Sequence, residues 1–191
     1  VIDALKLEKI NLLGHSLGGY VSLAFAEKFP EILESMTLFF STTVADDDEK
    51  KQIRKRSIAV IDENFETFVK TSIPNLFSNN EKDILEGKIE LAKNIAKSTD
   101  KNGVKAAQLG MAERPDRTEI LENLDAKILI IAGKYDNAVK TENLLKIIPE
   151  KTNIKTYVLD CGHNGHWEKP TICAEIINTE LLHNLPKHFL L

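Results

Sequence analysis

The sequence is poor in the residues that mark several classes of protein. Two cysteines, Cys161 and Cys173, are too few for a disulfide framework, and such sparing use suits a reducing compartment. No apolar run approaches the roughly 20 residues that a membrane-spanning helix needs. We therefore expect a cytoplasmic protein with no membrane partner. The chain begins at Val1 rather than Met, so the sequence leaves open whether a signal segment precedes it.

The sequence also lacks an excess of charge of one sign. Against 29 Asp and Glu stand 25 Lys and Arg, for a formal net charge of −4, which offers no broad basic face for nucleic acid. The one basic cluster, residues 50–56, directly follows acidic residues 46–49, and acids suit the first turn of a helix. We interpret this segment as the solvated start of a helix and expect no nucleic-acid partner.

Short apolar runs alternate with segments of helical spacing. Four runs are predicted to be strands: residues 10–13, 36–40, 128–132 and 155–159. Three segments are predicted to be helices: residues 17–29, 139–148 and 170–184. This alternation predicts βαβ units and a mainly parallel sheet, and therefore an α/β fold.

The middle of the chain interrupts this alternation. More than 80 residues between Phe40 and Ile128 lack a strand pattern and show helical spacing instead. A structureless connection of that length would be improbable in a compact domain. We predict an inserted helical cap over residues 46–120, between core segments 1–45 and 121–191, that covers a site at the C-terminal ends of the strands.

The most specific motif is the hexapeptide Gly14-His15-Ser16-Leu17-Gly18-Gly19, which fits the pattern G-x-S-x-G. It lies between a predicted strand and a predicted helix, where a sharp turn projects a nucleophilic serine above the sheet. The backbone N–H of Leu17 is then placed to donate to an oxyanion. A glycine-rich turn with an incidental serine is the plain alternative. A phosphate-binding loop fits poorly, because Ser16 replaces a required glycine and the P-loop lysine is absent.

A serine nucleophile needs a base, and the base needs an acid that orients it, here in the chain order Ser, acid, His. Asp136 follows the third apolar run and His163 follows the fourth. Ligands of open parallel sheets bind at the C-terminal edge of the strands, where all three loops lie. We therefore predict that Ser16, Asp136 and His163 form a catalytic triad.

Each assignment has competitors. Asp125 lies in the loop before the same strand, and Asp46 follows the preceding strand, where some arrangements carry the acid. Asp136 could also be an ordinary turn aspartate. For the base, His166 lies in the same loop as His163.

The other histidines and the cysteines are assigned no chemistry. His15 adjoins the nucleophile and is expected to point away from it and pack, while His183 and His188 are expected on the surface of the C-terminal helical region. Three metal-ligand types fall within six positions: Cys161, His163 and His166. That spacing is poor for structural zinc and no second cysteine pair exists, so we predict no metal.

Several segments together resemble the α/β-hydrolase superfamily from Leu5 to the end of the chain. They are NLLGHSLGGY (11–20), AFAEKFP (24–30), LIIAG (129–133) with Asp136, and Gly162-His163 followed by EKP (168–170). The resemblance favours His163 over His166 and implies a sheet of the α/β-hydrolase type. Residues 111–117 look like the end of the cap in esterases and enol-lactonases of this superfamily. These residues could contact the substrate, or they could form a helix end in which Arg114 pairs with Asp116.

What the resemblance implies is a serine hydrolase that cleaves an ester, lactone or thioester of a small substrate through an acyl-enzyme, without metal or organic cofactor. Ser16 would attack the acyl carbonyl, His163 would take its proton and Asp136 would hold the imidazolium. The serine argues against haloalkane dehalogenase or epoxide hydrolase chemistry. The alternatives are a non-catalytic binding protein or inactive fragment, and an acyltransferase or cofactor-free perhydrolase.

The sequence departs from the resemblance at its front. Family members carry several strands and a second oxyanion donor before the serine strand, and only residues 1–9 precede it here. We therefore expect the N-terminal strands to be missing, with residues 10–13 forming a bare sheet edge. We also expect this chain to be the C-terminal portion of a longer hydrolase. The oligomeric state stays open.

Overall fold

A computed structural model describes residues 1–182, and its core is a parallel sheet of four strands in the order β1-β2-β3-β4. The strands are β1 (Ile10–His15), β2 (Leu33–Phe39), β3 (Lys127–Gly133) and β4 (Ile154–Leu159). All four predicted strands are present, and the predicted α/β fold with a mainly parallel sheet is confirmed. The expected sheet edge is also confirmed, since β1 is an outer strand of the described sheet and Leu13 is 41% exposed.

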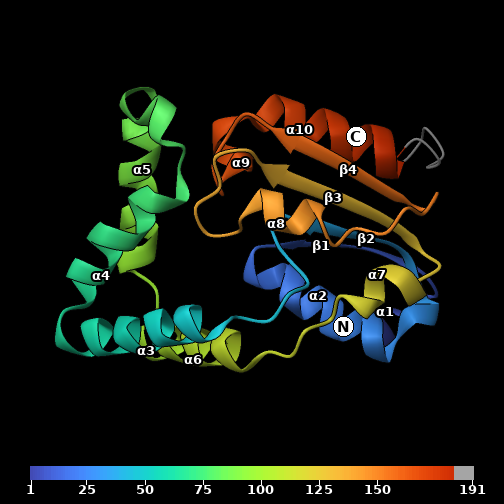
Figure 1. The fold of residues 1–191 in the computed structure, drawn as a ribbon, viewed down its shortest axis with the longest axis horizontal. Coiled ribbons are helices and arrows are strands. Elements are labelled where there is room, and N and C mark those ends of the chain that lie inside the picture. Colours follow the sequence, from blue (N-terminus) through green and yellow to red (C-terminus); the bar gives the residue numbers. More distant parts are fainter. Residues whose placement is uncertain (183–191) are drawn as a thin grey trace.

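Helices cover both faces of this sheet (Figure 1). One face carries α2 (Leu17–Lys28), α7 (Glu119–Asn123) and α8 (Thr141–Leu145), and the other carries α10 (Pro170–Ile177). The central strand β3 packs against both layers, because Ile128 and Ile130 face the first layer and Leu129 and Ile131 face the second. This placement explains why its sequence is apolar without alternation.

The long connection from β2 to β3 forms a group of helices that stands beside the sheet (Figure 1). It contains α3 (Asp48–Glu63), α4 (Phe65–Ser72), α5 (Lys82–Lys97) and α6 (Lys101–Glu113), with 3-10 turns at Ile73–Leu76 and Asn79–Glu81. We call residues 48–113 the helical insert. Its first helix begins within the acidic run, with Asp48 and Glu49 in the first turn as predicted, and the Asp47 side chain accepts the N–H of Lys50 at 2.8 Å.

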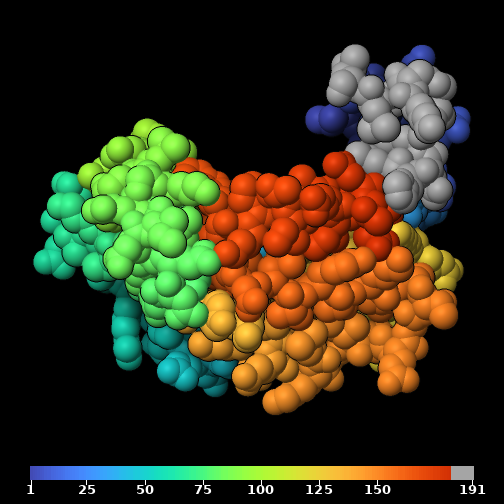
Figure 2. Space-filling view, turned by 90° about the horizontal axis from the view of Figure 1, so that it is seen from above, coloured from blue at the N-terminus to red at the C-terminus, as the bar shows by residue number. Residues whose placement is uncertain are grey.

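The insert rests on the core near the C-terminal helices. Figure 2 shows its surface adjoining that of the segment that includes α10. There the buried side chains of Phe77 and Leu85 pack with the partly buried Trp167, a residue of α9 (Gly165–Glu168). Lys88 donates to the carbonyl of Trp167 at 2.6 Å. The insert is therefore fixed to the core by apolar packing as well as by its two chain connections.

Two helix predictions need correction. The helix expected over residues 139–148 is only the five-residue α8, because the Asp136 side chain accepts the N–H groups of Ala138 and Val139 and holds that segment in a turn. The helix expected over 170–184 begins at Pro170 as predicted, but α10 ends at Ile177 and continues as a π-helical turn, Asn178–Leu182. His183 and His188 lie outside the described residues.

The remaining elements are short. They are α1 (Ile2–Leu5) and a 3-10 turn at Pro30–Ile32. Among residues 1–182, no helix combines the length and the apolar character needed to cross a membrane.

Candidate active site

Ser16 occupies a strained turn between β1 and α2. Its φ of 51° lies in the left-handed region, a backbone conformation that costs on the order of 1–3 kcal/mol for a residue other than glycine. The turn also needs its glycines, because a Cβ on Gly14 would overlap the backbone of Gly18, and one on Gly19 would overlap Ser41. Ser41 instead donates its hydroxyl to the Ser16 carbonyl at 2.8 Å. These contacts fix the direction of the Ser16 side chain.

The three predicted residues meet at the C-terminal edge of the sheet. Nε2 of His163 lies 2.7 Å from Oγ of Ser16, and Nδ1 of His163 lies 2.7 Å from Oδ2 of Asp136. The His163 and Asp136 side chains are buried. Oδ1 of Asp136 already accepts two backbone N–H groups, so Oδ2 is the oxygen left for the imidazole. A proton on Nδ1 leaves Nε2 free to accept the serine proton.

The competing acids lie elsewhere. Asp46 is paired with Arg54 and Arg114, and Asp125 precedes β3 at the opposite end of the strand from Asp136. Neither shares a hydrogen bond with His163 in the described part of the chain.

The competing base, His166, packs its ring against His15, with the ring centroids 4.7 Å apart. Burial, followed by the neighbouring charges of His15 and His163, lowers the pKa of His166 to about 4. His166 remains exposed to solvent, and its imidazole shares no hydrogen bond with Ser16 or Asp136 among the described residues.

His15 has a contact that sequence reasoning missed. Its Nε2 lies 3.1 Å from the carbonyl oxygen of His163, and since a carbonyl only accepts, that nitrogen carries the proton. Burial lowers the pKa of His15, although the hydrogen bond to His163 opposes this shift. The ring also packs near Phe39 and Phe40, as expected. Because it adjoins Ser16, His15 links the turn at Ser16 to the loop that carries His163.

The histidine loop, the segment after β4 that carries His163, is hydrogen-bonded to the helical insert. No sequence motif predicted this connection. The carbonyl of Leu76 accepts the N–H of His163 at 2.9 Å and that of the following residue at 3.1 Å. The buried carboxylate of Glu168 accepts the N–H of Gly162 at 2.9 Å and that of Ser78 at 3.1 Å. The loop that carries His163 is thus bonded to residues 76–78 of the insert.

A cavity of about 430 Å³ opens over Ser16 and His163, between the core and the insert. Most of its wall is apolar and comes from the insert: Ile53, Phe65, Phe68, Val69, Ile73, Leu76, Val104 and Met111. A mostly apolar pocket with a few convergent polar groups is typical of small-molecule sites.

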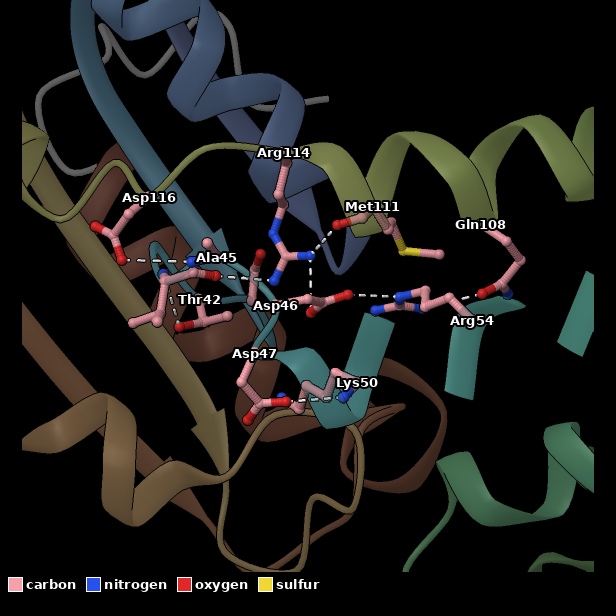
Figure 3. Close-up of polar contacts among 12 residues, drawn as sticks. Thr42, Ala45, Asp46, Asp47, Lys50, Arg54, Gln108, Met111, Arg114 and Asp116 are labelled. Atoms are coloured by element: carbon pink, nitrogen blue, oxygen red, sulfur yellow. Dashed lines mark hydrogen bonds and ion pairs between the residues drawn. The ribbon is translucent and has the colours of Figure 1, made fainter. Parts of the chain in front are cut away.

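A buried ionic cluster lies at the junction of core and insert (Figure 3). Oδ2 of Asp46 accepts Nε of Arg54 at 2.7 Å, and Oδ1 of Asp46 lies 2.9 Å from Nη1 of Arg114, an ion pair without hydrogen-bond alignment. Burial alone would raise the pKa of Asp46, but the two guanidinium groups hold it below its ordinary value. The Arg114 guanidinium also lies 4.0 Å over the Tyr20 ring.

The Arg114–Asp116 pair considered from the sequence is wrong. Arg114 turns inward to Asp46 and donates to the carbonyl of Val44 at 2.8 Å, while Asp116 accepts backbone N–H groups, that of Thr118 at 2.8 Å among them. A buried carboxylate satisfies a buried guanidinium better than an exposed neighbour in the sequence does.

Metal ligands do not gather in the part of the chain that the structure describes. Residues 1–182 hold no group of three or more His, Cys, Asp or Glu side chains suited to a metal ion. Cys161 and Cys173 are free, buried thiols, and burial raises the pKa of both, that of Cys173 to about 11.

Comparison with known proteins places this arrangement in context. A family model described as alpha/beta hydrolase fold matches residues 1–170. The chain is 26% identical over 179 residues to a 2-hydroxy-6-oxononadienedioate/2-hydroxy-6-oxononatrienedioate hydrolase of Escherichia coli, covering 88% of this chain and 60% of that protein.

Solved structures agree with this match. A thermophilic esterase from Thermogutta terrifontis, with malate bound, superposes with a TM-score of 0.83 at 32% identity, covering 93% of this chain and 66% of that one. The enol-lactonase from Burkholderia xenovorans also superposes with a TM-score of 0.83 but at 17% identity, which shows the fold alone. The chain thus spans 60% of the E. coli hydrolase and 66% of the esterase.

Proposed function

The chain belongs to the alpha/beta hydrolase fold family, and from that premise we propose that it is a serine hydrolase with Ser16, His163 and Asp136 as its triad. The observation that carries this proposal is the imidazole of His163, which lies 2.7 Å from both the serine oxygen and the aspartate oxygen. Such a linked nucleophile, base and orienting acid is the arrangement that activates a serine.

The reaction follows from the positions of these atoms. Oγ of Ser16 bonds to the acyl carbon while Nε2 of His163 takes its proton, and the negative charge of Asp136 stabilises the imidazolium. The imidazolium then protonates the leaving group as the carbon–oxygen or carbon–sulfur bond breaks. Water, deprotonated by the same imidazole, then bonds to the acyl carbon. The ester bond to Oγ of Ser16 breaks, Oγ takes back the proton from Nε2 of His163, and the acid product leaves. The N–H of Leu17, the first residue of α2 and without an acceptor inside the helix, donates to the oxyanion.

The cavity supports a substrate of limited size. About 430 Å³ with a mainly apolar wall accommodates a small, partly apolar ester, lactone or thioester. We propose that the helical insert acts as the cap of this site, because its side chains form most of that wall. The esterase and the enol-lactonase on the same fold support this substrate range by analogy.

An active-site label tests the proposal directly. A fluorophosphonate probe is expected to modify Ser16 in the folded protein, and Ser16→Ala is expected to lose labelling and at least about 10³-fold in kcat for 4-nitrophenyl butyrate. Equal turnover by the Ser16→Ala variant, or an unlabelled folded protein, would refute the assignment. An alcohol added to the assay as an acyl acceptor separates hydrolysis from acyl transfer. Transfer to the alcohol gives a new ester, whereas hydrolysis gives the free acid.

A further inference from the structure

One cationic side chain stands in a cavity wall that is mostly apolar and also includes neutral polar side chains such as those of Ser57, Ser72 and Thr99. Apart from histidines, the side chains that line the cavity include a single ionisable group of fixed charge, the guanidinium of Arg54 on α3. Lining residues of the described chain include no Asp, Glu or Lys. Placing a cation next to apolar side chains costs free energy unless its N–H groups are hydrogen-bonded. The N–H groups of Arg54 that lack a partner therefore indicate where a ligand could bind.

Arg54 is held in place by two partners. Its Nε donates to Oδ2 of Asp46 at 2.7 Å, and its Nη1 donates to Oε1 of Gln108 at 3.2 Å (Figure 3). Asp46 is shared with Arg114, so it is not a counter-ion for Arg54 alone. The Arg54 side chain keeps 22% exposure, and Nη2 makes no hydrogen bond within residues 1–182.

Gln108 supplies a second free donor. Because an arginine can only donate, the amide oxygen of Gln108 must face Arg54, and the amide nitrogen is left with its two N–H groups. That nitrogen also makes no hydrogen bond among the described residues, and Gln108 lines the same cavity. Two neighbouring side chains from different insert helices thus offer donors and no acceptor.

We propose that Arg54 and Gln108 form a subsite for a carboxylate group of the substrate, so that the natural substrate is an ester, lactone or thioester that also carries a negative charge. An ionised carboxylate only accepts hydrogen bonds, which matches a pair of donors. The low dielectric of an apolar cavity strengthens the attraction. This inference rests on the proposed function and specifies its substrate class.

A matched pair of esters tests the subsite. The substrates are the mono-4-nitrophenyl esters of succinate, glutarate and adipate and the methyl esters of the same compounds, which lack the charge. We expect the wild-type protein to prefer the charged ester of at least one length. The ratio of kcat/KM for charged over uncharged ester should fall about 10- to 100-fold in Arg54→Gln, as expected for hydrogen bonds to a charged group. Gln108→Leu should lower the ratio less.

Two further variants separate recognition from stability. Arg54→Lys keeps a cation next to Asp46 and should retain part of the preference while protecting the fold. Arg56→Gln removes the same charge from an exposed position on the same helix, so its ratio should equal that of wild type. Thermal unfolding of every variant shows that each is folded at the assay temperature.

The outcomes distinguish the two proposals. Arg54 and Gln108 also both border a second hollow, which residues of α3 and α6 line together. If Nη2 of Arg54 faces that hollow, the ratio will not change in Arg54→Gln, which overturns the subsite. An equal loss for both esters also overturns it. If wild type hydrolyses neither ester and Ser16 is unlabelled, the proposed function has failed instead. Calorimetric binding of glutarate to Ser16→Ala, with and without Arg54→Gln, then decides the subsite alone.

Discussion

Glu168 provides the sharpest test of how His163, the proposed base, is held in position. Glu168 is 7% exposed, and its carboxylate accepts two backbone N–H groups, one from Gly162 in the histidine loop and one from Ser78 in the insert. Glu168→Ala leaves both donors buried without a partner. Since a hydrogen bond to a charged group contributes about 1.5–3 kcal/mol, the loss should be about 3–6 kcal/mol. A typical domain has only about 5–15 kcal/mol of stability, so this variant should be folded only marginally.

Urea denaturation followed by tryptophan fluorescence measures this loss well, because Trp167 is the single tryptophan of the sequence and packs on Phe77 beside the network. Glu168→Gln retains one acceptor oxygen and should lose about half as much free energy of unfolding. Glu175→Ala, at an exposed position on α10, is the control and should stay within about 0.5 kcal/mol of wild type.

The activity of Glu168→Gln tests whether the same hydrogen bonds also position the imidazole of His163. Because Glu168 is bonded to the residue before His163, its loss should loosen the imidazole and lower kcat more than it raises KM. The reasoning is refuted if Glu168→Ala unfolds within about 1 kcal/mol of wild type. It is also refuted if Glu168→Gln is destabilised while its kcat and the pH profile of its kcat remain those of wild type.

The remaining predictions concern the nucleophile turn and the sheet. Gly14→Ala would force a methyl group into the backbone of Gly18 and should destabilise the fold by about 1–3 kcal/mol in thermal unfolding, whereas Gly87→Ala on α5, with no atom within 4 Å, should gain up to about 1 kcal/mol. Hydrogen bonds, first that from Lys127, lower the pKa of Glu180 to about 2. Its stabilisation should therefore be complete above its unfolded pKa of about 4.3 and lost as pH falls through 2. Glu180→Gln should flatten the unfolding free energy over that interval, and an unchanged pH slope would contradict this account.

The sequence predicted what depends on local geometry. A positive φ at Ser16 needs glycines around it, and those glycines stand in the motif. Asp136 and His163 each follow an apolar run, and parallel strands bring their following loops to one edge. The position of these residues therefore follows from periodicity and chain order. Their catalytic role stays a proposal until Ser16 is tested.

The incorrect and missing predictions concern contacts between distant segments. Pairing Arg114 with Asp116 used the nearest opposite charge in the sequence, but the partner in the structure is Asp46, 68 positions away. The shortened α8 has a related cause, since the Asp136 carboxylate takes backbone donors that a longer helix would have used. Charge and helical spacing do not show which of several possible partners is buried with a given side chain.

The hydrogen bonds that hold the loop of His163 show why such contacts cannot be predicted from the sequence. The N–H groups of Gly162, His163 and Asn164 are all bonded, and every acceptor is either Leu76 of the insert or Glu168, which is itself bonded to the insert. A backbone carbonyl accepts equally well from any residue type, so nothing in the side chain of Leu76 marks its role. A segment that separates two strands by more than 80 residues thus forms the cavity wall and also fixes the loop that carries the imidazole. Because Leu76 and Ser78 are both bonded to this network, motion of residues 76–78 should displace His163, which would couple the helical insert to the proposed chemistry.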